Sequence, residues 1–295
     1  MNTLYPKVRI LDGGMGRELE RIGAPFRQPE WSALALIETP DLVAQAHQHF
    51  IDAGARIITT NTYALVPFHL GEQRFATSAK QLAHVAAHIA RKLAEKNGVE
   101  VAGCIPPAFG SYKPELFDPE KVADILLPLI QGQEALVDFW LIETAASYDE
   151  ALHVVRLLKA HSNKPVWLAF TLTNRDDLAK PLRLRSGETL SQIIPLLSAV
   201  DAVLFNCSQP EEMEEAIAYI HKAAPALTIG AYANSFSEIK REHNANALLS
   251  SLREDVTPQK YQQFAKRWLD AGATVIGGCC GIGPAHIKAL NELIK

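Results

Sequence analysis

The amino-acid sequence predicts a (β/α)8 barrel, because short β-rich apolar runs alternate with longer segments of helical period along the whole chain. Eight such pairs fit within 295 residues. Eight repeated units in a chain of that length are more typical of one closed barrel than of two separate domains. We therefore expect a single barrel domain over residues 1–295, with a doubly wound parallel sheet as the alternative.

Eight apolar runs are the expected strands of the barrel. Each run is short and is followed by polar or turn-forming residues, which is typical of strands in a buried parallel sheet. The runs cover residues 8–12, 56–61, 99–104, 138–143, 165–170, 201–206, 227–232 and 273–278.

Prolines and glycines mark where the intervening helices begin and end. A capping residue before proline favours a helix start, because proline needs no amide partner at the first helical position. Glycine favours a helix end, because it adopts the left-handed conformation without steric cost. We expect starts at Thr39-Pro40, Asp118-Pro119 and Thr257-Pro258, and ends at Gly54, Gly98 and Gly272.

The segment from Leu172 to Glu188 is the most loop-like part of the chain, because it mixes charged residues with proline and glycine. It follows the end of an expected strand. We therefore expect it to overhang the functional end of the barrel.

Composition excludes several classes of partner. The formal net charge is −4 and the Lys and Arg residues are scattered, so we expect no nucleic-acid partner. The first residues lack the layout of a signal peptide and no apolar run approaches membrane-spanning length, so we expect a cytoplasmic protein with no membrane contact. Four cysteines in a reducing compartment indicate metal binding, reactivity or burial rather than disulfides.

Polar and metal-binding residue types follow directly after the expected strands. In a barrel of this kind the chemistry lies at the carboxyl ends of the strands. Two carboxylates, an amide and three of the four cysteines should therefore meet at one rim. The segments are Asp12-Gly13-Gly14-Met15-Gly16, Thr60-Asn61-Thr62-Tyr63, Glu143-Thr144, Asn206-Cys207, Tyr232-Ala233-Asn234 and Gly277-Gly278-Cys279-Cys280-Gly281.

Four of these segments, taken in order, resemble the homocysteine S-methyltransferase family over nearly the whole chain. They are Asp12-Gly13-Gly14-Met15-Gly16, Thr60-Asn61-Thr62-Tyr63, Asn206-Cys207 and Gly277-Gly278-Cys279-Cys280-Gly281. The most specific part is the cysteine pair after two glycines, with a single cysteine about seventy residues earlier. The resemblance implies a (β/α)8 barrel and one zinc ion held by Cys207, Cys279 and Cys280. It also implies methyl transfer to homocysteine, which yields methionine and places the protein in methionine biosynthesis.

The resemblance also implies roles for the substrate-binding residues. Asp12 and Glu143 match acidic residues that hold the amino group of homocysteine. The backbone amides around Gly13, Gly14 and Met15 would receive the substrate carboxylate, as a glycine-rich turn can. Asn61 and Asn234 match positions that line the same pocket.

Zinc chemistry explains why three cysteines are needed. Three protein ligands leave the fourth tetrahedral position open, as in catalytic zinc sites, and a substrate thiol can fill it as thiolate. Neighbouring residues in an extended strand point to opposite faces, so Cys279 and Cys280 share one ion only if the strand ends between them. Gly277, Gly278 and Gly281 supply the freedom for that turn.

Other interpretations of the same residues stay open. The glycines after the eighth strand are also typical of a phosphate-binding turn, which needs backbone amides and no thiols. Cys279 and Cys280 could form a vicinal disulfide, the zinc could be structural, or the enzyme could act on another thiol or donor. Asp12 could cap a turn, and Glu143 could pair with an arginine such as Arg185.

The remaining cysteine and three histidines have simpler expected roles. We interpret Cys104 as a small buried residue, with a role in the site as the alternative. His84 and His88 fit a solvated helix face, although their spacing would also suit a metal. His286 follows Pro284 at a helix start and is expected to cap or pack locally.

The sequence departs from the commonest family pattern at Arg17 and at Cys104 to Pro107, near the expected pocket. The chain ends 15 residues after Cys280, which leaves no room for folate- or cobalamin-handling modules. We therefore expect an already activated sulfonium donor, S-methylmethionine or S-adenosylmethionine. Tyr63, Phe109, Tyr112 and Tyr232 are the aromatic candidates to face its charge.

Overall fold

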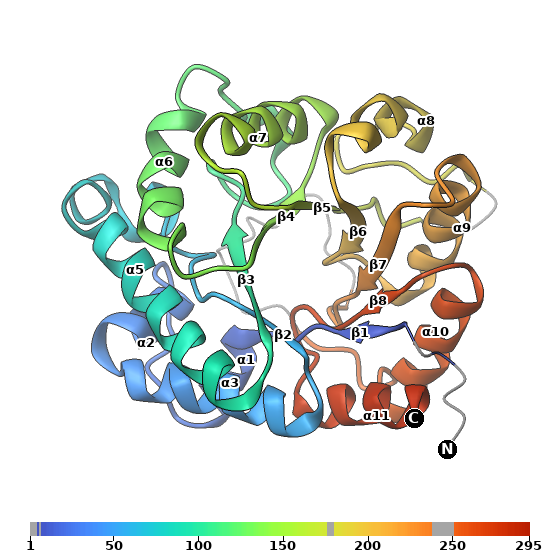
Figure 1. Ribbon diagram of the computed structural model, residues 1–295, viewed down its shortest axis with the longest axis horizontal. Helices are drawn as coiled ribbons and strands as arrows, with labels where there is room; N and C mark the ends of the chain where they lie inside the picture. The colour runs from blue at the N-terminus through green and yellow to red at the C-terminus, as the bar shows by residue number, and fades with distance from the viewer. Residues whose placement is uncertain (1–4, 6, 176–179, 238–250) are drawn as a thin grey trace.

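The computed structural model describes residues 5, 7–175, 180–237 and 251–295. Within these ranges the chain forms a ring of parallel strands surrounded by helices (Figure 1). The fold is the expected (β/α)8 barrel, which excludes the doubly wound sheet. No helix of the described part is long and apolar enough to cross a membrane.

All eight expected strands are present in the described residues, each within about two residues of its expected ends. They hydrogen-bond in the order β1-β8-β7-β6-β5-β4-β3-β2. A parallel bridge between Leu11 and Ile57 joins β1 to β2 and closes the ring. The strands are β1 Arg9–Ile10, β2 Ile57–Thr59, β3 Glu100–Ile105, β4 Phe139–Ala145, β5 Val166–Phe170, β6 Ala202–Asn206, β7 Thr228–Tyr232 and β8 Val275–Ile276.

Helices pack around the ring and cover its outer face (Figure 1). Three of them, α1 to α3, lie between β1 and β2, so the first loop of the barrel is the most elaborate. The helices are α1 Met15–Arg21, α2 Ser32–Glu38, α3 Pro40–Ala53, α4 Pro67–Leu70, α5 Glu72–Asn97, α6 Val122–Gln133, α7 Tyr148–His161, α8 Leu190–Ile193, α9 Met213–Ala223, α10 Pro258–Asp270 and α11 Pro284–Ile294.

Two of the three expected helix starts are confirmed. The hydroxyl of Thr257 accepts the Lys260 amide at 3.2 Å, which caps α10. α3 begins at Pro40, but the Thr39 hydroxyl donates to Ala35 of the preceding helix instead of capping. The expected start at Asp118-Pro119 is wrong, because Asp118 accepts the Glu120 amide in a turn and α6 begins only at Val122.

The expected helix ends are confirmed by backbone geometry. Gly54 follows α3 with a φ of 115°, Gly98 follows α5 with a φ of 66°, and Gly272 lies just beyond α10 with a φ of 115°. These angles are in the left-handed region, which a side chain would strain.

The core has two layers that alternate along each strand. One layer fills the barrel interior with Leu11, Leu141 and Leu204 among its members. The other lies between strands and helices and includes Ile10, Ile142 and Phe205. This alternation along each strand decides which residues at the strand ends point toward the barrel axis.

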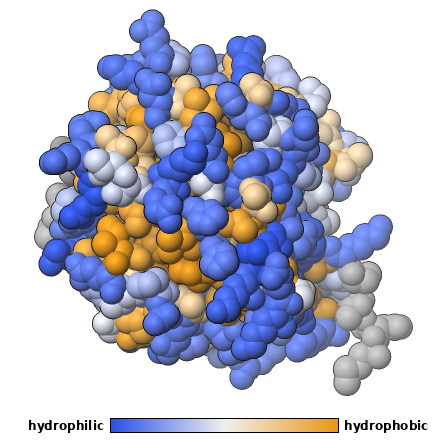
Figure 2. All heavy atoms as spheres, turned by 60° about the vertical axis from the view of Figure 1, so that its left-hand side comes forward, coloured by the Kyte–Doolittle hydropathy of each residue, from blue (hydrophilic) through white to orange (hydrophobic). Residues whose placement is uncertain are grey.

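The face in Figure 2 is largely hydrophilic, with hydrophobic side chains showing between protruding polar ones.

Candidate metal centre and active site

A cavity of about 460 Å³ lies at the carboxyl ends of the strands. It is lined by most residues that the sequence analysis placed on one rim. Those lining it are Asp12, Gly13, Gly14, Met15, Gly16, Thr60, Asn61, Tyr63, Tyr112, Glu143, Thr144, Asn206, Cys207, Tyr232, Gly278, Cys279 and Cys280.

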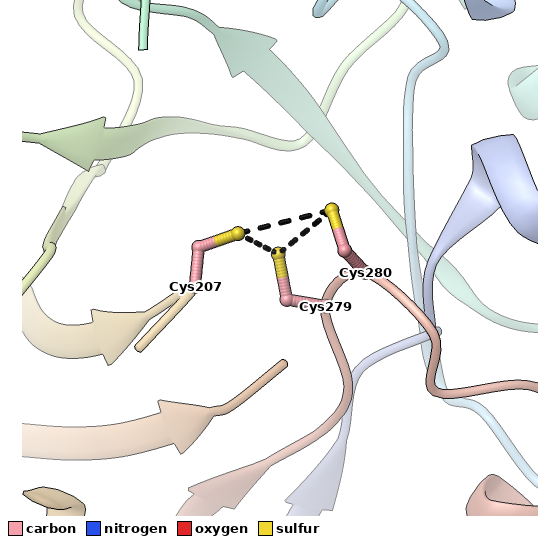
Figure 3. A group of neighbouring side chains, drawn as sticks. All are labelled: Cys207, Cys279 and Cys280. Carbon is pink, nitrogen blue, oxygen red and sulfur yellow. Dashed lines mark hydrogen bonds between the residues drawn. The ribbon is translucent and has the colours of Figure 1, made fainter. Parts of the chain in front are cut away.

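Three cysteines form a compact thiol cluster on the cavity wall, and Figure 3 shows their sulfurs turned toward one another. The Sγ atoms of Cys207 and Cys280 lie 3.8 Å apart, those of Cys279 and Cys280 3.9 Å apart, and those of Cys207 and Cys279 2.8 Å apart. Tetrahedral zinc with sulfur ligands at about 2.3 Å spaces them about 3.8 Å apart. Two edges of the cluster fit a metal ion, and the third would open by about 1 Å.

Cys207 reaches the cavity through an unusual backbone conformation. Leu204 faces the barrel interior and Phe205 faces the helices, so strict alternation would turn residue 207 outward. Its φ of 49° instead lies in the left-handed region and turns the side chain inward beside Asn206. This conformation is uncommon for a residue other than glycine.

Cys279 and Cys280 share the cluster because the strand has already ended. β8 stops at Ile276, earlier than the break expected between the two cysteines. Gly281 has a φ of 81° and turns the chain. A β-carbon on Gly14 would lie 2.6 Å from the Cys279 carbonyl oxygen, so glycine lets the first loop approach this turn.

The phosphate-binding alternative loses three backbone donors at this turn. The amides of Gly277, Gly278 and Cys279 donate to the carbonyls of Ala231, Asp12 and Ala233. The Gly14 amide likewise donates to Ile282 at 2.9 Å, which corrects the expectation that it receives a substrate carboxylate.

Hydrogen bonding makes the three thiols unequal. Hydrogen bonds with Cys279 and Cys280 hold the pKa of Cys207 well below its usual range, and a contact with Asn234 acts in the same direction. The shared hydrogen bonds with Cys207 raise the pKa values of Cys279 and Cys280. The three thiols therefore differ in acidity, and Cys207 is the one that loses its proton most readily.

Two carboxyl groups line the same cavity as the thiol cluster, Asp12 buried and Glu143 half-buried. Asp12 accepts the Thr59 amide at 2.7 Å and the Thr59 hydroxyl at 3.1 Å, yet burial raises its pKa to about 8, with the charge of Glu143 adding to the shift. Burial also raises the pKa of Glu143 to about 7. Carboxyl groups held in this way are suited to a ligand cation, which would offset the cost of their charges.

Cys104 has a contact that its expected role did not include. It is fully buried, as expected, but its thiol donates to Glu143 Oε2 at 3.1 Å. Cys104 is thus the buried residue that we expected, and it does not line the cavity. A thiol at this position supports the carboxylate from behind the cavity wall.

Asn61 lines the cavity and donates to the Ser32 carbonyl at 3.1 Å. Asn234, which we expected on the wall, is buried behind it, because its carboxamide oxygen accepts the Phe236 amide at 3.3 Å.

Three of the four candidate aromatic residues line the cavity. The Tyr112 hydroxyl donates to the Cys207 carbonyl at 3.3 Å, and the Arg185 guanidinium lies 4.7 Å from the Tyr112 ring centroid. Tyr63 and Tyr232 also line the wall. Phe109 lies away from it and packs against Phe117, so its expected position at the rim is wrong.

The simpler interpretations of the histidines hold. His84 and His88 are exposed and stack on one face of α5. His286 accepts the Gly283 amide at 3.2 Å and so caps α11. The segment 172–188, as far as it is described, reaches the rim through Arg185 but contributes no lining residue.

Several lining residues come from the first two loops and were not predicted from the sequence. Phe26, Trp31 and His69 line the cavity. Arg17 also lines it and pairs with Glu20 at 2.7 Å. Of these only Arg17 carried a signal, as a departure from the family pattern.

A barrel with three thiols and two carboxyl groups in one cavity at its functional end defines a barrel enzyme whose cysteines could bind a metal. The family model described as homocysteine S-methyltransferase matches residues 9–294, and the chain belongs to this family of methyltransferases. Family membership supports methyl transfer to homocysteine.

The similar proteins are related over their full length. The chain is 27% identical to homocysteine S-methyltransferase 1 of Zea mays, covering 97% of this chain and 94% of that one. It is 25% identical to the selenocysteine Se-methyltransferase of Brassica oleracea var. italica, covering 96% and 88%. The metallated form of the homocysteine methyltransferase MmuM from Escherichia coli aligns with a TM-score of 0.78 at 26% identity, covering 97% and 96%.

Proposed function

We propose that this enzyme transfers a methyl group from a small sulfonium compound, S-methylmethionine or S-adenosylmethionine, to the thiol of homocysteine, forming methionine. The observation that carries the proposal is the thiol cluster of Cys207, Cys279 and Cys280 in one cavity with the carboxyl groups of Asp12 and Glu143. The thiol cluster suits a soft metal and a substrate sulfur, and the carboxyl groups suit an ammonium group.

Zinc is the proposed metal, and the three cysteines are its proposed ligands and the catalytic residues. A bound zinc ion would lower the pKa of the substrate thiol and hold its sulfur at the fourth tetrahedral position. The spacing of the Sγ atoms supports this choice, since two of the three edges, 3.8 and 3.9 Å, suit a tetrahedral ion.

The rest of the substrate is held by residues of the first and fourth strand ends. Asp12 and Glu143 bind the ammonium, whose charge favours their ionised forms. The amides of Gly13 and Met15 receive the carboxylate, while Gly14 serves through its lack of a side chain. Asn61 completes the wall, and Asn234 acts on Cys207 from behind it.

The transfer itself is a direct displacement. The homocysteine sulfur, having lost its proton to solvent, donates an electron pair to the methyl carbon and forms a new C–S bond. The bond between that carbon and the donor sulfur breaks, and its electron pair stays on the donor, which leaves as a neutral thioether. Tyr63, Tyr112 and Tyr232 can stabilise the sulfonium charge before it is lost, at roughly 0.5–2 kcal/mol for each ring contact.

We further propose that residues 1–295 act as one barrel domain and that the enzyme works in the cytoplasm on small molecules. The absence of disulfides among the four cysteines suits a reducing compartment. The selenocysteine methyltransferases among the relatives make the selenol amino acid a second candidate acceptor, since it combines the same ammonium with a soft nucleophile.

The decisive experiment compares methyl donors with zinc-loaded enzyme and homocysteine. We expect methionine from S-methylmethionine, slower formation from S-adenosylmethionine, and little from betaine or methyltetrahydrofolate. Turnover with betaine alone would refute the sulfonium donor. Selenocysteine in place of homocysteine tests the second acceptor.

The metal assignment is tested by zinc analysis of the reduced protein. We expect one zinc per chain, lost in the Cys207→Ser variant because two thiolates do not complete the site. Cys104→Ser is the matched control and should keep its zinc. Full zinc occupancy in Cys207→Ser would contradict the assignment.

A further inference from the structure

The side chain of Asn206 joins the ends of β4 and β6 across the intervening strand β5. Its carboxamide oxygen accepts the Thr144 amide at 3.0 Å, and its carboxamide nitrogen donates to the Thr144 hydroxyl at 2.9 Å. Asn206 and Thr144 are both buried. Neither residue has a part in the chemistry proposed above, although each directly precedes or follows a residue that does.

Both ends that Asn206 joins have left-handed backbones. The φ of Thr144 is 59° and that of Cys207 is 49°. A β-branched residue rarely adopts this conformation, and it persists only where the surroundings hold it. The two hydrogen bonds from one carboxamide supply such a hold on Thr144.

The conformation of Thr144 sets the direction of Glu143. Ile142 pairs with Leu168 and Ala145 with Phe170, so β4 contains one residue more than β5 over this stretch. The extra residue forms a β-bulge, which re-aims side chains. Glu143 and Thr144 consequently both line the cavity, although consecutive residues of a regular strand would face opposite sides.

We propose that Asn206 is a positioning residue that fixes Glu143 and Cys207 relative to each other. The inference rests on the proposed function, in which Glu143 holds the ammonium end of the amino acid and Cys207 belongs to the centre that holds its sulfur end. One carboxamide thereby sets the span that a bound homocysteine must fit. Loss of Asn206 disturbs the sites for the ammonium and for the sulfur together, whereas loss of Glu143 or of Cys207 disturbs only one of them.

The test measures zinc affinity and the homocysteine KM in the same variants. Asn206→Ala should weaken zinc binding and raise the homocysteine KM, each by 10- to 100-fold, as is usual for residues that support metal ligands. Thr144→Val, which removes only the hydroxyl partner, should shift both in the same direction by less. Glu143→Gln should raise the KM and leave zinc affinity unchanged.

Two further variants separate positioning from general stability. Glycine adopts the left-handed conformation without strain. Asn206→Ala should therefore change zinc affinity and the homocysteine KM less in a Thr144→Gly background than in the parent. Ser162→Ala is the matched control, because Ser162 accepts the Trp140 indole at 2.8 Å beyond the C-terminus of α7, away from the cavity. It should lower the melting temperature and change neither zinc affinity nor KM.

A crystal structure of metal-free Asn206→Ala gives a readout that does not depend on activity. We expect Thr144 to leave the left-handed region and Glu143 to turn from the cavity. A variant that keeps the parent backbone at residues 143, 144 and 207, or that keeps both zinc affinity and KM, would overturn the proposal. A parent protein that binds no zinc and methylates no thiol would refute the proposed function instead, and the variant structure would still decide the role of Asn206.

Discussion

At the scale of single residues, the carboxyl groups of Asp12 and Glu143 line the same cavity and both have raised pKa values. Burial raises the pKa of Asp12 to about 8 and that of Glu143 to about 7. Near neutral pH both groups lie within their titration range, and they interact, so they titrate as a pair. An ammonium ligand would draw protons off them.

This titration predicts how amino-acid binding depends on pH. An acid with a raised pKa gains its charge only as pH rises, so binding of 2-aminobutyrate, which keeps the ammonium but lacks a thiol, should tighten from about pH 6 to pH 8.5. Inhibition constants against homocysteine measure it. Asp12→Asn should weaken binding by roughly 1.5–3 kcal/mol and flatten the profile. A parent inhibition constant that rises with pH would contradict the assigned role.

At the scale of elements, the first loop and the cysteine turn touch backbone to backbone. A β-carbon on Gly14 would lie 2.6 Å from the Cys279 carbonyl oxygen and 3.1 Å from the Cys280 α-carbon. No flexible side chain is present there to give way. The packing of the two loops therefore depends on glycine at this position.

We predict that Gly14→Ala displaces the cysteine turn and weakens zinc binding by at least tenfold, because the backbone must move to admit the methyl group. A chelator competition measures the affinity. Gly283→Ala is the matched control, since its β-carbon would meet nothing within 4 Å and its φ is −97°. Equal zinc affinities in the two variants would show that the close approach does not matter.

Helix α3 carries a buried histidine that has no role in the proposed chemistry. His47 is fully buried, and within the described residues neither ring nitrogen has a hydrogen-bond partner. Burial lowers its pKa to about 4. The neutral ring is therefore the form that fits between α3 and its neighbours.

This histidine should make the protein sensitive to acid. Its pKa is lower in the folded than in the unfolded state, so the stability it permits is present above about pH 6.5 and is lost as pH falls toward 4. His47→Leu should stabilise the protein by about 2 kcal/mol more at pH 5 than at pH 7.5, relative to the parent. Urea unfolding at both pH values measures the difference. If His47→Leu changed the free energy of unfolding equally at the two pH values, His47 would be protonated in the folded state as readily as in the unfolded state.

At the scale of the whole molecule, the proposed zinc site ties together the end of the barrel. Cys207 follows β6, and Cys279 and Cys280 follow β8, so the ligands come from segments 72 residues apart. A ligand that binds only the folded state stabilises it by mass action. Zinc should act in this way on the barrel.

We predict that chelation lowers the melting temperature of the zinc-loaded protein by several degrees and that added zinc restores it. Scanning calorimetry with and without a chelator measures the shift. Cys207→Ser should melt near the chelated parent and should not respond to zinc. A zinc response in that variant equal to that of the parent would place the metal elsewhere.

Most of the fold could be predicted from local signals in the sequence. Hydrophobic periodicity located all eight strands, because burial on both faces leaves an apolar run wherever a strand forms. Gly54, Gly98 and Gly272 located helix ends, because φ above zero selects glycine. The rim position of the cysteines followed, since the carboxyl ends of parallel strands share one end of the barrel.

Only the tertiary structure decided how those residues face the cavity. Thr144 and Cys207 are left-handed without being glycine, so no local signal marks them, and a hydrogen bond from a distant strand holds Thr144. The start of α6 and the position of Asn234 behind the wall also depend on hydrogen bonds that a sequence pattern does not show. The sequence determines which residues reach the rim, because regularly spaced apolar runs mark where each strand ends. The direction of each side chain at the rim depends on contacts between strands, because the in-and-out alternation of a strand stops where the strand ends.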